Sequence, residues 1–133
     1  MGVKRPRADS VKAGDTFLVV HASYNHLYVV CSDPATNSDQ VLIISITTLR
    51  PKEEECCIIT AGEHPFVKHR SCARYKDAKI VSVDALLKLL DGSLAERRQP
   101  VSADVLARIR AGASQSDYLP EECRRLLQGQ SLI

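Results

Sequence analysis

The sequence predicts an α+β fold in which a small, strongly curled antiparallel sheet of five or six strands, a half-open barrel, precedes two or three C-terminal helices. Strand-like segments follow one another up to residue 83, and the hydrophobic period changes from two to about 3.6 from residue 84 onward. A length of 133 residues is typical of one domain. We therefore expect a mobile basic arm over residues 1–12 and one domain over residues 13–133, β-rich from 14 to 83 and helical from 84 to 128.

The sheet is expected to be organised around the run of β-branched and aliphatic residues at positions 41–49. Such a run is typical of a strand whose start is buried on both faces. Three hydroxyl groups occur near its end, and side chains alternate between the two faces of a strand. Ser45 and Thr47 therefore share one face while Thr48 points to the other, and we expect any functional site near this end.

Five further segments have the composition of strands. The first two are expected to form an antiparallel hairpin, because only the short polar stretch 22–26 separates them. The expected strands are residues 16–21, 27–31, 56–60, 71–75 and 78–83.

Helical periodicity takes over after the last strand. A first helix is predicted over residues 84–90, followed by a polar linker over residues 94–100. Ser102 is a good N-cap for a second helix that Gly112 ends, and Pro120 occupies a first helical position of a third. The candidate caps of the first helix are Ser82 or Asp84 at its start and Gly92 at its end.

Composition and charge narrow the classes of function. A net charge of +2 is too small to attract the protein as a whole to nucleic acid or an anionic membrane. Aromatic residues make up only 5% of the chain, which argues against a surface of stacking rings for single-stranded nucleic acid. The five cysteines include no Cys-x-x-Cys pair, so free buried thiols and a reducing cytoplasm are expected. The four histidines lack the spacing of a metal site. We expect no cofactor, no bound metal and no membrane association.

A local set of basic residues follows the fourth expected strand, and two interpretations of it remain open. In the first, Arg70, Arg74 and Lys68 contact RNA phosphates. Tyr24 and Tyr75 then stack on the bases. In the second, the cations belong to a solvated sheet edge, where they discourage unwanted strand pairing. The set comprises Lys68, His69, Arg70, Arg74, Lys76 and Lys79.

Four short motifs recur in the same order in a known family. A Gly-Asp turn at residues 14–15 opens the first strand, and residues 29–33 are an apolar strand that ends in Ser-Asp. Residues 45–48 (Ser-Ile-Thr-Thr) end the central strand, and residues 81–86 lead a late strand into a helix through Ser-Val-Asp. In these features the chain resembles the MazF/PemK family of toxin endoribonucleases. The resemblance spans residues 13–112 and implies an SH3-like barrel with terminal helices, usually a homodimer.

The resemblance also implies which residues act. In this family RNA is cut without a metal by an arginine at the end of the first loop and a threonine at the end of the central strand. Thr47 matches the threonine, whereas the arginine position falls at about Asn25, which cannot supply a cation. The next residue, His26, can act as an acid or base because histidine titrates near neutral pH. We therefore expect His26 and Thr47 to act in catalysis, with Asn25 and Arg74 assisting.

Two hypotheses from different classes follow. The first is a toxin-like protein that binds single-stranded RNA, has metal-independent endoribonuclease activity and is bound by an antitoxin or another protein. The second is a non-catalytic barrel that binds a protein partner or itself through apolar strand edges and its terminal helix. Cleavage of long single-stranded RNA in the presence of EDTA distinguishes the first from the second.

Overall fold

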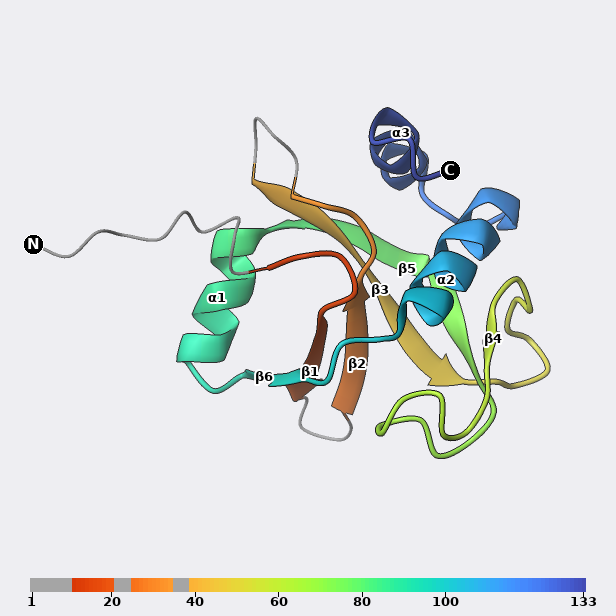
Figure 1. The fold of residues 1–133 in the computed structure, drawn as a ribbon, viewed down its shortest axis with the longest axis horizontal. Coiled ribbons are helices and arrows are strands. Elements are labelled where there is room, and N and C mark those ends of the chain that lie inside the picture. The colour runs from red at the N-terminus through yellow and green to blue at the C-terminus, as the bar shows by residue number, and fades with distance from the viewer. Residues whose placement is uncertain (1–10, 21–24, 35–38) are drawn as a thin grey trace, which may run out of the picture.

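The computed structural model describes residues 11–20, 25–34 and 39–133, and these form six strands and three helices (Figure 1). In chain order the elements are β1 (Thr16–Val20), β2 (Asn25–Val30), β3 (Gln40–Thr48), β4 (Ile58–Ile59), β5 (Ser71–Ser82), α1 (Val83–Asp91), β6 (Ala95–Arg98), α2 (Ala103–Gln115) and α3 (Glu121–Gly129).

All six strands belong to one antiparallel sheet with the order β4-β5-β3-β2-β1-β6. The predicted central strand is β3, which lies between β2 and β5 and is buried from Val41 to Ile46. The sheet curls into a half-barrel, with α1 beside one end and α2 and α3 beside the other (Figure 1). This arrangement confirms the predicted α+β fold of a curled sheet followed mostly by helices.

One long strand replaces two short ones that the sequence predicts. Residues 71–75 and 78–83 were expected to be separate, but β5 runs continuously through both. The charged residues between them, Lys76 and Asp77, are exposed and resemble a turn in sequence. The register of β5 against the middle of β3 shifts at this point, so an irregularity within the strand takes the place of a turn.

A further strand lies where a polar linker was expected. Within residues 94–100, Ala95–Arg98 form β6, which pairs with β1 at the edge of the sheet. Only Ala95 is buried, and the three charged residues that follow are exposed. Backbone pairing with β1 therefore stabilises β6, and its sequence carries no apolar alternation from which a strand could be predicted.

Several element boundaries also differ from the prediction by a few residues. The strand expected over residues 56–60 is reduced to β4, which has two residues. The first two helices begin as expected, because the hydroxyls of Ser82 and Ser102 accept hydrogen bonds from the first turn of α1 and α2. Gly92 is the C-cap of α1, and Pro120 is the N-cap of α3 rather than its first residue.

Helix α2 does not end at Gly112 as predicted, but continues to Gln115. Gly112 is buried where α2 packs on the segment before β4. A Cβ atom at this position would lie 2.7 Å from the carbonyl oxygen of Cys56 and against the hydroxyl group of Tyr75. The glycine therefore permits a close helix approach, which is a different role from that of a helix terminator.

Two hydrophobic clusters occupy the two faces of the sheet. The larger lies between the sheet and the helices α2 and α3, and the smaller lies beneath α1. Val11 is fully buried in the smaller cluster, whereas residues 1–10 of the predicted arm lie outside the described residues. Representative members are Leu27, Ile44, Ile109 and Leu127 in the larger cluster and Phe17, Ile43 and Leu86 in the smaller.

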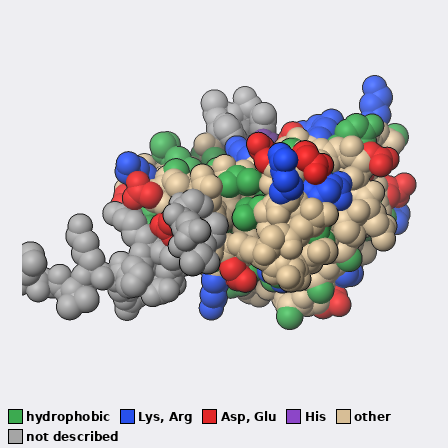
Figure 2. Space-filling view, turned by 90° about the horizontal axis from the view of Figure 1, so that it is seen from above, with side chains coloured by type: hydrophobic (Ala, Val, Ile, Leu, Met, Phe, Trp, Pro, Cys, Tyr) green, Lys and Arg blue, Asp and Glu red, His purple; other side chains and the backbone are tan. Residues whose placement is uncertain are grey.

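The surface carries charges of both signs. On the face seen in Figure 2, lysine and arginine side chains alternate with aspartate and glutamate, in keeping with the small net charge of +2. The five cysteines are free thiols, as the sequence predicts. Among the helices that the structure describes, none has the length and apolarity needed to cross a membrane.

Candidate functional site

The polar ends of β2 and β3 lie side by side on one face of the sheet. Leu27 of β2 pairs with Ile46 of β3, and both contribute to the larger cluster. Because side chains alternate along strands, the next residues outward, His26 and Thr47, project together from the opposite face. An imidazole and a hydroxyl group therefore follow the last pair of this ladder, one on each strand.

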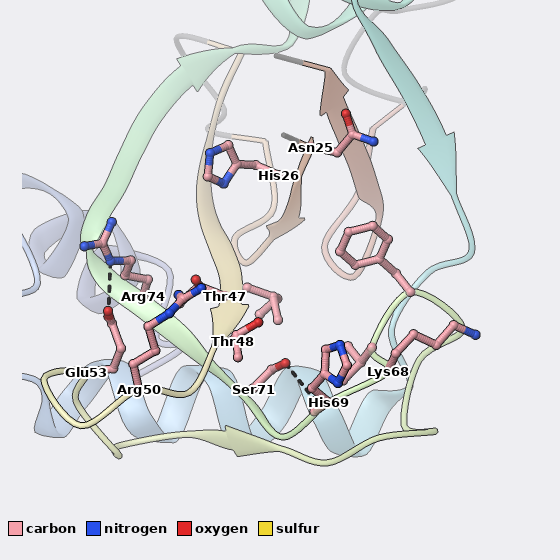
Figure 3. A pocket seen from close by; sticks show the side chains of 13 residues that line it. Asn25, His26, Thr47, Thr48, Arg50, Glu53, Lys68, His69, Ser71 and Arg74 are labelled. Atoms are coloured by element: carbon pink, nitrogen blue, oxygen red, sulfur yellow. Dashed lines mark hydrogen bonds and ion pairs between the residues drawn. The ribbon is translucent and has the colours of Figure 1, made fainter. Parts of the chain in front are cut away.

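Both side chains line an open cavity of about 610 Å³ (Figure 3). In this view Arg50 and Arg74 lie on one side of the cavity and Lys68 and His69 on the other, with Thr47 between them. The remaining lining residues are Asn25, Ile46, Thr48, Glu53, Phe66, Val67 and Ser71. Cations, hydroxyl groups and imidazoles thus gather at the end of the half-barrel where the sequence places the site.

The structure brings five of the predicted site residues to this cavity, although they come from separate parts of the chain. Asn25 and His26 begin β2, and Thr47 lies near the end of β3. Arg74 belongs to β5 and is paired directly with a β3 residue. Lys68 lies on the loop between β4 and β5.

Of the other three predicted residues, two do not line the cavity and the third lies outside the described residues. Arg70 is exposed but does not line it. Tyr75 was predicted to stack on bases, and this is wrong, because the side chain is 1% exposed and its hydroxyl donates to the Ile109 carbonyl at 2.6 Å. Burial also raises the pKa of this phenol. Tyr24 lies outside the described residues.

Sequence reasoning missed Arg50 as a site residue, because it begins a charged segment expected to be solvated loop. Arg50 is indeed exposed, but it follows Thr48 by two residues and lines the same cavity as His26. The sequence offered one signal for this residue, a cation shortly after a strand that ends in hydroxyl groups. The site therefore has a guanidinium on β5 and another just beyond β3.

Arg74 is held in a defined position by two carboxylates. Its Nε atom lies 3.1 Å from Oε1 of Glu53, and its Nη1 atom lies 2.6 Å from Oδ2 of Asp77. Partial burial opposes the charge, but hydrogen bonds and Coulomb attraction to these two carboxylates outweigh it and raise the pKa of the guanidinium. Arg74 is therefore a permanently charged, oriented group in the cavity wall.

A buried histidine fixes the loop that carries the opposite wall. His64 is 4% exposed, its Nδ1 accepts a hydrogen bond from the Phe66 N–H at 3.0 Å, and its Nε2 lies 2.5 Å from the Gln99 carbonyl oxygen. Nε2 must therefore carry the proton, because a carbonyl oxygen can only accept. This neutral tautomer connects the loop before β5 to the segment after β6, and so positions Phe66 and Lys68.

A second attachment joins the same loop to α2. Glu63 accepts hydrogen bonds from the backbone N–H and the hydroxyl of Thr60, at 2.8 and 3.1 Å, and forms an ion pair with Arg108. The bond from the Thr60 backbone is the largest of the interactions that lower the pKa of the Glu63 carboxyl. The wall of the cavity is thus fastened at two neighbouring residues, Glu63 and His64.

Metal ligands are not grouped in the part of the chain that the structure describes, where no three histidine, cysteine or acidic side chains are placed to share an ion. The polar side-chain groups at the cavity are imidazoles, hydroxyls, guanidiniums, an ammonium, an amide and one carboxylate. This set is suited to acid–base chemistry on an anionic substrate.

The fold and the cavity define a small half-barrel protein with a cation-lined site at one end. No protein-family model and no curated protein sequence matches the chain. Among solved structures, it is similar to the MazE-MazF complex (Form-II) from Deinococcus radiodurans, with a TM-score of 0.51 and 19% sequence identity. The similarity covers 77% of this chain and 89% of the compared chain. The chain therefore has a MazF-like fold, and at this identity the similarity concerns the fold alone.

Proposed function

We propose that the protein is a MazF-like toxin that binds single-stranded RNA and cleaves it without a metal ion. The observation that carries this proposal is that His26, Thr47, Arg50 and Arg74 line one cavity. These residues come from β2, β3, β5 and the segment after β3, and only the curled sheet brings them together.

The proposed reaction is an internal transesterification. His26 accepts the proton of a ribose 2′-hydroxyl, and the 2′-oxygen attacks the adjacent phosphorus atom. The bond from phosphorus to the 5′-oxygen then breaks, leaving a 2′,3′-cyclic phosphate and a 5′-hydroxyl that takes up a proton. We assign the donation of this proton to His69, which lines the same cavity.

The negative charge of the pentacoordinate phosphorus is stabilised by two kinds of group. The Thr47 hydroxyl donates a hydrogen bond to a non-bridging oxygen, and the guanidiniums of Arg50 and Arg74 supply positive charge. Asn25 occupies the position of the family arginine and assists by hydrogen bonding to the phosphate. In this proposal Arg50 takes over the electrostatic role that Asn25 cannot perform.

Binding of the RNA strand outside the reacting centre is assigned to cations on the loop before β5. Lys68 lines the cavity, and Arg70 is exposed two residues further along. We assign to both of them contacts with phosphates that flank the cleaved bond. Their contribution predicts RNA binding that weakens as the salt concentration rises.

The proposal is tested by incubating the purified protein with long single-stranded RNA in the presence of EDTA. We expect cleavage to fragments with 2′,3′-cyclic phosphate ends. His26→Ala and Thr47→Ala are each expected to lower the rate by about 10²- to 10³-fold. The matched control is Arg125→Gln, an exposed arginine on α3 that does not line the cavity, and its rate should equal that of the wild type.

The non-catalytic hypothesis makes the opposite prediction for the same assay. If the wild-type protein neither cleaves RNA nor binds it in a salt-sensitive manner, the nuclease proposal is wrong and a protein-interaction module remains. Cleavage that is unchanged in both variants would instead show that the cavity is not the active site.

The similar structure is a complex, and this favours a protein partner for the present chain as well. We propose a MazE-like antitoxin as that partner, and a homodimer as the assembled form of the chain. Sedimentation of the purified chain, which should give twice the monomer mass, tests the homodimer. For the antitoxin, we expect a small reading frame next to the gene of this protein. Co-expression of the product of that reading frame should suppress the cleavage.

A further inference from the structure

A second hollow continues the cavity around the start of β2. It has a volume of about 570 Å³ and shares Asn25, Phe66 and Lys68 with the cavity already described. Its other walls are formed by Leu18, His64, Pro65, Arg98 and Gln99. We call this hollow the Phe66 groove. Because three residues line both spaces, a chain-like ligand that fills the cavity has a direct continuation into the groove.

Phe66 is a large apolar side chain exposed to solvent at this junction. It is 37% exposed, and among the large hydrophobic residues described as exposed it is the one that lines the cavity. Its backbone N–H donates to the buried His64 ring, so the backbone of the loop is fixed at this residue. An exposed aromatic ring on such a loop is suited to stacking on a nucleobase.

The charges of the Phe66 groove match a phosphate backbone. Lys68 and Arg98 line it, and among the described residues that line it there is no aspartate or glutamate. Arg98 pairs with Glu96 at 2.7 Å, but both side chains are about half exposed, so this pair is screened by water and the guanidinium can still contact an anion.

A small hollow on the other side of the cavity differs in this respect. It is lined by Lys52, Lys76 and Tyr118, but also by the carboxylates of Glu53 and Glu54. Its volume is only about 130 Å³. Among the described lining residues, the charged side chains are cations in the Phe66 groove and of both signs in the smaller hollow, which favours the groove for an RNA strand leaving the cavity.

We propose that the nucleotide next to the cleaved bond binds in the Phe66 groove, where its base stacks on Phe66 and its phosphate contacts Lys68 and Arg98. This inference rests on the proposed function, since it assigns the adjoining subsite of the same RNA. Stacking on a phenyl ring accepts any base, so the groove contributes affinity and strand direction rather than a base preference.

The first test measures binding of a short single-stranded RNA analogue that lacks 2′-hydroxyl groups and cannot be cleaved. By fluorescence anisotropy, Phe66→Ala should bind about tenfold more weakly than the wild type, and Phe66→Trp should retain binding. Tyr118→Ala is the matched control, because Tyr118 is an exposed aromatic residue outside the groove. Its affinity should be unchanged.

The second test uses the salt dependence of the same binding. Arg98→Gln should lower the slope of log K against log salt by about 0.7, the value for one phosphate contact on a single strand. Arg125→Gln, remote from the groove, should leave the slope unchanged. A purely structural role of Arg98 would change stability but not this slope.

The outcomes separate the two proposals. If the wild type binds and cleaves RNA while Phe66→Ala and Arg98→Gln bind like the wild type, the groove proposal is wrong and the nuclease proposal stands. If the wild type binds no RNA, both are wrong. Unchanged thermal unfolding midpoints of the variants ensure that a loss of binding reports the groove and not misfolding.

Discussion

His26 and Thr47 illustrate how the position of a residue along a strand decides whether it lines the cavity. Thr47 could be selected from sequence because hydroxyl groups are unusual at the end of a strongly apolar strand. His26 could be selected because it follows the position where the resemblance implies a cation. Both follow the last pair of the β2–β3 ladder, Leu27 with Ile46, and one residue of register slip would turn one of them to the other face.

Single residues were also where sequence reasoning failed. Tyr75 was expected to be available for stacking, but it is buried and bonded to α2. Arg50 was expected to be solvated, and exposure alone does not reveal that it faces a cavity. Both errors concern side-chain surroundings that depend on elements distant in the sequence.

At the residue scale we predict that the buried thiols resist alkylation and lower the stability at alkaline pH. Burial raises the pKa of Cys72 and of Cys123 from 9.0 to about 11. The unfolded chain then loses these protons first, so the free energy of unfolding should fall as the pH rises from about 9 to about 11. In native protein at pH 9, iodoacetamide should modify the half-buried Cys56 first.

Urea titrations at pH 8 and pH 10 measure the fall in stability directly, and mass spectrometry identifies the modified thiols. Rapid labelling of Cys72 or Cys123 without urea would contradict their burial in the folded protein.

At the scale of elements, the strands with apolar runs could be predicted, and those formed by tertiary context could not. β3 has nine residues, most of them β-branched or aliphatic. β6 has the sequence Ala-Glu-Arg-Arg and exists because β1 offers it a backbone edge. The attachment of the loop before β5 through His64 and Glu63 likewise depends on Gln99 and Arg108, which lie 35 and 45 residues further along the chain.

Helix α2 provides a prediction at this scale. Gly112→Ala places a methyl group against Tyr75 and 2.7 Å from the Cys56 carbonyl oxygen, where backbone must move to admit it. We expect a loss of about 1–3 kcal/mol in the free energy of unfolding, although alanine is the better helix former.

The matched control for this substitution is Gly129→Ala at the end of α3, where a Cβ meets nothing within 4 Å. Urea unfolding of both variants measures the difference. Equal stability of Gly112→Ala and Gly129→Ala would show that α2 does not pack closely against the segment before β4.

At the scale of the whole molecule, the order of strands and then helices indicated the α+β class, and the strong curl explains the site. A flat sheet would leave the start of β2, the end of β3 and the loop before β5 spread along one edge. The half-barrel brings them around one opening (Figure 3). The volume of that opening and its continuation into the Phe66 groove follow from packing and were beyond prediction from sequence.

The central claim is that His26 and Thr47 act together on one phosphodiester. A double-mutant cycle on the single-turnover cleavage rate of a short RNA tests it most directly. If the claim is right, His26→Ala and Thr47→Ala each lower the rate, and the double variant is little slower than the slower single variant, because the two side chains serve one step. Rate losses that multiply independently, or a wild-type rate no faster than that of the double variant, would contradict it.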